Sequence, residues 1–189
     1  MLNSSPNIRL RPKRVKSAFA LLGCIALVAC SPALNWREAR PPGSDLLLTF
    51  PCKPQHLSRQ VTLGGRAVTM QMTGCVAAGM TFALASADVG HARQLAPALA
   101  TLRASVLANV QGHADALQPS AVAHAVTGLR DAVAMDVSGK VAADRPVREH
   151  VVLFAHGTRV YQATALAVGK GWQPDAAATF AASIRLPAH

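Results

Sequence analysis

Aromatic residues, charged residues and long apolar runs are all scarce in this chain. Phe, Trp and Tyr make up 4% of its 189 residues, and Asp, Glu, Lys and Arg make up 15%. Beyond residue 16 there is no run of Lys or Arg, and the basic residues are not interleaved with aromatic ones. Nucleic-acid-binding surfaces typically have both features. Although the formal charge is +10, the sequence therefore predicts no nucleic-acid partner.

Motifs that mark common catalytic centres are also missing. The chain has no H-E-x-x-H zinc motif and no G-x-S-x-G nucleophile elbow. The seven histidines are dispersed, and His150 and His156 lie about 20 Å apart if they share one straight strand. The sequence thus predicts no enzyme, no metal and no cofactor. A pocket that brings a histidine and a carboxylate within hydrogen-bonding reach would favour an enzyme instead.

The first thirty residues have the pattern of a bacterial lipoprotein signal. An uncharged stretch of about 13 residues, 17–29, is shorter than the roughly 20 that a membrane-spanning helix needs. Leu27-Val28-Ala29-Cys30 matches a lipobox, in which the cysteine is acylated before cleavage. An uncleaved N-terminal anchor is the alternative. Five basic residues precede the uncharged stretch: Arg9, Arg11, Lys13, Arg14 and Lys16.

This signal predicts the organisation and the location of the chain. We expect a signal peptide over residues 1–29, a lipidated tether over 30–44 that begins at Cys30, and a single globular domain over 45–189. Removal of the signal would lower the formal charge from +10 to +5. The lipid would hold the protein to the cell envelope, facing the periplasm. Ser31 rather than aspartate follows Cys30. Resemblance to Gram-negative lipoproteins, in which an aspartate there is the usual inner-membrane retention signal, therefore implies the outer rather than the inner membrane.

Two cysteines, Cys52 and Cys75, lie in the predicted globular domain. In an exported protein such a pair usually forms a disulfide. The alternative, a redox or metal-binding pair, would call for a C-x-x-C spacing or adjacent histidine ligands. We therefore expect a structural disulfide between Cys52 and Cys75.

Apolar periodicity predicts an α+β domain, a mostly antiparallel sheet with helices packed on it. Gly64-Gly65 between two alternating runs predicts a hairpin, residues 138–140 suggest a turn, and residues 113–126 fit either a short helix or a loop. The expected strands are 45–50, 59–63, 66–73, 80–84, 130–137, 148–154 and 159–168, and the expected helices are 94–110 and one that begins at Pro174.

Three short motifs in this order resemble segments of PsbP-like domains. Residues 48–54 resemble the opening F-P-G-K-P segment, with Cys52 in place of the usual glycine. Residues 157–161 resemble a G-x-R-x-Y hairpin, and residues 178–186 resemble the closing F-F-x-S-F-R-L helix. The resemblance covers about Leu46 to Leu186. It implies an α/β/α sandwich like that of the DcrB-like lipoproteins, in a family whose members are mainly binding or assembly proteins.

Two functions follow as hypotheses. The first is a noncatalytic, lipid-anchored envelope protein that binds another envelope protein or supports an assembly. The second is a lipoprotein that binds a small apolar ligand or a lipid, because Met70, Met72 and Met80 lie on adjacent predicted strands and could form a soft apolar pocket. Core packing is the simpler interpretation of these three methionines.

Overall fold

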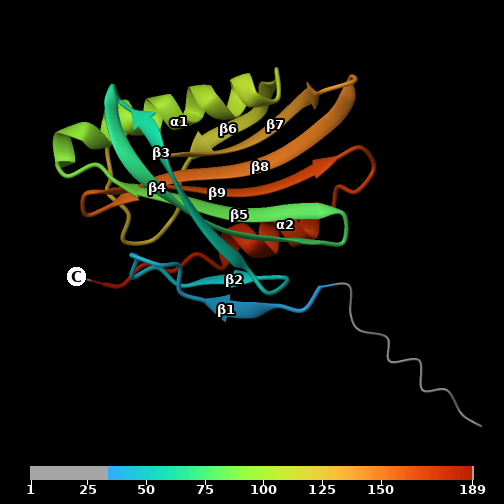
Figure 1. The fold of residues 1–189 in the computed structure, drawn as a ribbon, viewed down its shortest axis with the longest axis horizontal. Helices are drawn as coiled ribbons and strands as arrows, with labels where there is room; N and C mark the ends of the chain where they lie inside the picture. Colours follow the sequence, from blue (N-terminus) through green and yellow to red (C-terminus); the bar gives the residue numbers. More distant parts are fainter. Residues whose placement is uncertain (1–33, 189) are drawn as a thin grey trace, which may run out of the picture. The chain divides into compact units, whose positions relative to one another are not determined.

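A seven-stranded antiparallel sheet organises the part of the chain that the computed structural model describes, residues 34–188 (Figure 1). The signal peptide expected over 1–29 and the lipidation expected at Cys30 lie outside the described residues. In sheet order the strands are β3 (Gln55–Leu63), β4 (Arg66–Ala77), β5 (Met80–Asp88), β9 (Arg159–Val168), β8 (Arg145–His156), β7 (Val133–Val141) and β6 (His113–Pro119).

The two faces of this sheet are covered by different elements (Figure 1). Helix α1 (Leu95–Asn109), preceded by the short helix η1 (Ala92–Gln94), packs on one face. Helix α2 (Pro174–Ala182) and a small antiparallel pair, β1 (Arg37–Ala39) and β2 (Leu48–Phe50), pack on the other. The predicted α+β class, a mostly antiparallel sheet with helices packed on it, is confirmed.

Alternation along the strands explains why the domain has two cores. Successive side chains of a strand point to opposite faces of the sheet. In β8, Val151 and Leu153 join the core under α1, whereas Val152 and Phe154 join the core under α2. Because both faces are buried, this segment has no polar alternation, as its continuous apolar run indicated.

Both predicted helices are present. The stripe Leu95, Leu99, Leu102 and Val106 faces the sheet and is buried, and the helix ends within one residue of the expected position. In α2, proline occupies the first turn, where its missing N–H costs nothing. Phe180 of α2 lies with its ring centroid 5.4 Å from both Phe50 and Phe82.

Two local predictions about the middle of the chain need correction. The first half of residues 113–126, expected to form a helix or a loop, contains edge strand β6. The turn expected at 138–140 lies inside β7, and the chain reverses near Ala143 and Asp144, which have positive φ. A Cβ at Gly139 would lie 2.3 Å from the carbonyl oxygen of Val110, so this glycine lets the end of α1 approach the sheet closely.

The described part of the expected tether, residues 34–44, belongs to the folded unit. Leu34, Trp36 and Ala39 pack against the core under α2. The Asn35 amide donates a hydrogen bond to the carbonyl of Pro51, and the Trp36 ring lies 6.2 Å from that of Phe82 between centroids. Any free spacer before the domain is therefore shorter than residues 30–44.

The predicted disulfide between Cys52 and Cys75 is confirmed. It joins the loop before β3 to the far half of β4, across a sequence separation of 23 residues. Among the described residues, no helix is both long and apolar enough to span a membrane.

Replacing both cysteines, Cys52→Ser with Cys75→Ser, should lower the free energy of unfolding by about 3 kcal/mol, because the unfolded chain regains the entropy of a closed loop of this size. Urea unfolding followed by circular dichroism measures the change. Reductant should lower the urea concentration at which the wild type unfolds to that of the variant, and it should leave the variant's unfolding unchanged. Equal transitions for the variant and the oxidised wild type would contradict the expectation.

Candidate functional site

The outer side of β3, here called the β3 edge, is an unpaired border of the sheet. On its inner side β3 pairs with β4 along its whole length, Gln55 to Leu63, without a bulge. Within residues 34–188 no other backbone hydrogen bond involves β3. Every residue from Gln55 to Gln60 is exposed. About 30 Å of strand therefore presents free N–H and C=O groups on one side.

The opposite border of the sheet, β6, is far less suited to pairing. A register shift between Ala114 and Ala116 interrupts its ladder with β7, and it ends at Pro119. Bulges, prolines and charges such as Asp115 are devices that keep edge strands from pairing with other chains. β3 has neither a bulge nor a proline. The two edges of the sheet are thus not equivalent.

An apolar hollow of about 480 Å³, here called the disulfide groove, lies beside the β3 edge. Leu57 is 57% exposed and Val76 is 70% exposed, more than any other large apolar side chain of the described residues. Leu57 pairs in register with Met72, and Gly74 pairs with Ala83. The full lining is Cys52, Lys53, Gln55, Leu57, Met72, Thr73, Gly74, Cys75, Val76, Thr81 and Ala83.

Different contacts hold the two ends of the β3–β4 hairpin. Gly64 and Gly65 both have positive φ, which the tight turn between β3 and β4 requires. The turn is held against α1, because the Gly64 amide donates a hydrogen bond to the Thr101 hydroxyl. The other end of the hairpin is held by the disulfide. Leu57 and Val76 lie on the same sheet face as α1 but are not covered by it, as their exposure shows.

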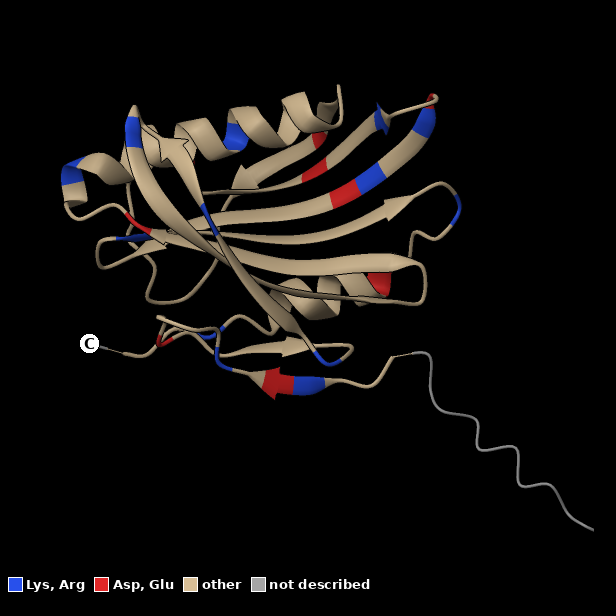
Figure 2. Cartoon of the chain, in the orientation of Figure 1, with Lys and Arg blue, Asp and Glu red and all other residues tan. Residues whose placement is uncertain are grey.

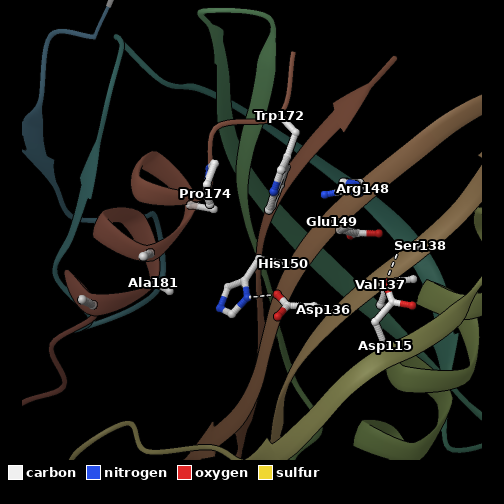
Figure 3. Close-up of a pocket in the computed structure, with 13 residues that line it drawn as sticks. Asp115, Asp136, Val137, Ser138, Arg148, Glu149, His150, Trp172, Pro174 and Ala181 are labelled. Carbon is white, nitrogen blue, oxygen red and sulfur yellow. Dashed lines mark hydrogen bonds and ion pairs between the residues drawn. The ribbon is translucent and has the colours of Figure 1, made fainter. Parts of the chain in front are cut away.

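A second, more polar hollow of about 650 Å³ lies between α2 and strands β6 to β8 (Figure 3). His150 of β8 and Asp136 of β7 are neighbours in register, and His150 Nδ1 lies 2.6 Å from Asp136 Oδ1. The Ser138 hydroxyl donates a hydrogen bond to Asp115. His113 Nε2 lies 3.0 Å from Asp115 Oδ1. The wall toward α2 is built from alanines, including Ala181.

The contact between His150 and Asp136 is the kind of histidine–carboxylate pair that the sequence analysis named as a sign of an enzyme. The Ser138 hydroxyl, however, donates to Asp115, so the hydroxyl and the imidazole belong to separate pairs. Within residues 34–188, no three His, Cys, Asp or Glu side chains are placed to hold a metal ion. The arrangement is a row of cross-strand contacts on the part of the sheet that α2 leaves uncovered.

The three methionines do not form one pocket. Met70 is buried under α1, and Met72 packs beside that core. Met80 is buried in the core under α2, where its sulfur accepts a hydrogen bond from the Gln173 amide. Register explains the split. Met80 pairs with Ala77, so it points to the same face as the odd-numbered residues of β4. Met70 and Met72 are even-numbered residues of β4 and point to the other face. The expectation of a shared methionine pocket is wrong.

One buried acid, Glu149, is not among the site residues that the sequence predicted. Its side chain lies on the α1 face of β8 between Val147 and Val151, and the residue is 5% exposed. Burial raises the pKa of the Glu149 carboxyl to about 7, and a hydrogen bond from Thr164 partly opposes this rise. Glu149 alternates in sequence with Val147 and Val151, and this spacing was the signal that could have identified it as buried.

Comparisons with known proteins were made for the whole chain. No family model matches it, and neither the curated proteins nor the solved structures include a match.

Replacing the buried acid, Glu149→Gln, should remove a pH dependence of stability. The folded state holds this proton up to about pH 7, whereas the unfolded chain releases it near 4.5. The wild-type free energy of unfolding should therefore fall as the pH rises from about 4.5 to 7. The variant should be more stable at pH 8, by at most about 3 kcal/mol.

Urea unfolding at pH 5, 6, 7 and 8 measures this difference. Asp144→Asn is the matched control, because the Asp144 side chain is 89% exposed and its substitution should change the profile little. If the free energy of unfolding of Glu149→Gln changed with pH in the same way as that of the wild type, the pH dependence could not be assigned to Glu149.

Proposed function

We propose that this chain is a noncatalytic protein-binding module of the bacterial cell envelope, held at the membrane by a lipid on Cys30 and facing the periplasm. We further propose that it binds an extended segment of another envelope protein along the β3 edge. The open edge of β3 is the observation that carries this proposal. A strand border that is regular, long, exposed and free of bulges and prolines is a template for pairing.

Strand addition suits this edge physically. An incoming segment would satisfy the outward N–H and C=O groups of β3, each bond contributing about 0.5–1.5 kcal/mol. Main-chain bonds of this kind provide affinity, while pockets for alternate side chains provide specificity. The disulfide groove supplies such a pocket next to Leu57. The resemblance to PsbP-like domains, which are mainly binding or assembly proteins, supports the same class of function.

The proposed anchor would bring this edge into the compartment where such a partner would be found. The Cys52–Cys75 disulfide suits an oxidising environment outside the cytoplasm. The lipobox at Leu27-Val28-Ala29-Cys30 supports acylation of Cys30. Because the folded unit begins by Leu34, the domain would stay close to the membrane surface.

The intact mass of the membrane-extracted chain tests the anchor. We expect a mature protein that begins at Cys30 and carries acyl groups, with two further thiols alkylated only after reduction. Cys30→Ala should abolish acylation and release the protein from the membrane fraction. An unacylated wild-type chain that begins at another residue would overturn the proposed address.

Site-specific photo-crosslinking tests the binding edge in the full-length chain. A crosslinkable residue at Ser58, which is exposed on β3, should give a discrete adduct with one partner in intact cells. The same residue at Gln118, exposed on the opposite edge β6, is the matched control and should not. Sequencing of the adduct should locate one extended partner segment. No adduct at Ser58, or the same adduct at both positions, would contradict binding along β3.

A further inference from the structure

The Lys, Arg, Asp and Glu residues of the sequence stretch that contains β3 all have one sign of charge. Between Pro51 and Ala87, which includes β3, β4 and nearly all of β5, the chain has no Asp or Glu. All nine acidic residues of the protein lie outside this stretch. Figure 2 shows acidic residues on β1, β7 and β8, and Asp88 is the last residue of β5. The basic residues of the stretch are Lys53, Arg59 and Arg66.

These three cations are not neutralised within the described residues. Every ion pair found there involves other basic side chains, those of Arg103, His113, Lys140, His150 and Arg159. Lys53 lines the disulfide groove. Arg59 is the middle residue of β3 and is exposed. The open edge therefore combines free backbone groups, an apolar hollow and unopposed positive charge.

We propose, as an extension of the proposed function, that the segment bound along β3 is acidic. Leu57 and Arg59 lie two residues apart on one strand and point to the same face of the sheet. A partner strand in register would place one side chain opposite each, with Cβ atoms about 5 Å apart. The segment that fits has an apolar residue opposite Leu57 and a carboxylate opposite Arg59, two positions away.

A second copy of this chain fits the edge less well. Arg59 lies at the centre of β3, so two β3 strands paired antiparallel about their midpoints would set Arg59 against its own copy. Like charges placed directly opposite each other destabilise a strand pair. Neither strand could offer a carboxylate, because the stretch from Pro51 to Ala87 contains none.

An anionic membrane surface also fits less well than a peptide. Lipid headgroups would neutralise Lys53 and Arg59, but they would not form the regular ladder that the outward backbone groups of β3 can accept. Leu57 and Val76 would still need an apolar partner at the same edge. An acidic extended segment meets the backbone, the groove and the charges together.

Peptide binding by the full-length lipidated chain in detergent micelles tests the proposal. The probes are three fluorescent nine-residue peptides of alternating Thr and Val, in which one central Val is replaced by Glu, Gln or Lys. Fluorescence anisotropy should show that the Glu peptide binds about three- to fivefold more tightly than the Gln peptide, and that the Lys peptide binds more weakly than both. This preference should shrink as the salt concentration rises.

Arg59→Glu should reverse the order, so that the Lys peptide binds most tightly. Arg145→Glu makes the same charge change at the start of β8, away from the β3 edge, and should keep the wild-type order. Equal binding of all three peptides by the wild-type chain, or an unchanged order in Arg59→Glu, would overturn the acidic-segment proposal.

Two further readouts separate this proposal from its alternatives. If the Ser58 adduct forms while the peptides bind equally, strand addition stands and the acidic partner is overturned; if neither occurs, the proposed function fails as well. Mixed micelles that contain 30% phosphatidylglycerol should not compete with the Glu peptide, and full competition that Arg59→Glu abolishes would assign the cations to lipid. A β3-dependent dimer in analytical ultracentrifugation would assign the edge to a second copy.

Discussion

Burial of both faces of the central strands is the constraint on which the rest of the structure depends. Much of β5, β9 and β8 is covered by α1 on one side and by α2 with β2 on the other. Where both faces are covered the strands must be apolar, as residues 151–155 of β8 are, and the helices must present alanine, leucine and phenylalanine to them. Phe50, Phe82 and Phe180 meet at the centre of the α2 side. The strands farther from this centre are covered less completely, and both hollows lie there.

The same incomplete cover separates two kinds of surface. Over β6, β7 and β8 the uncovered face is polar, and its side chains satisfy one another, as His150 and Asp136 do. Around β3 the uncovered groups have no such partners within residues 34–188: the outward backbone is unpaired, Leu57 and Val76 are exposed, and Lys53 and Arg59 form no ion pair. This difference matters for binding, because groups without partners gain the most free energy from contact with an incoming chain.

Much of the fold could be predicted because local pattern and tertiary environment agree. Gly64-Gly65 is flanked by alternating runs and forms the hairpin turn, and the stripe from Leu95 to Val106 is the buried face of α1. Prediction failed where local pattern conflicted with packing. Gly139 looked like part of a turn, but its missing side chain makes room for the end of α1. Residues 113–119 lack strand alternation because β6 is an exposed edge with a bulge.

The sequence by itself determined the α+β class, the paired cysteines and the lipoprotein signal pattern, since each depends on residue type and spacing along the chain. Tertiary structure alone decided which residues meet across strands. Register divided Met70 and Met72 from Met80, buried Glu149 beneath α1 and brought His150 to Asp136. It also left β3 at the border of the sheet. A strand's neighbours are set by pairing between distant segments, so no local pattern could show that β3 would lie at the edge of the seven-stranded sheet that residues 34–188 form.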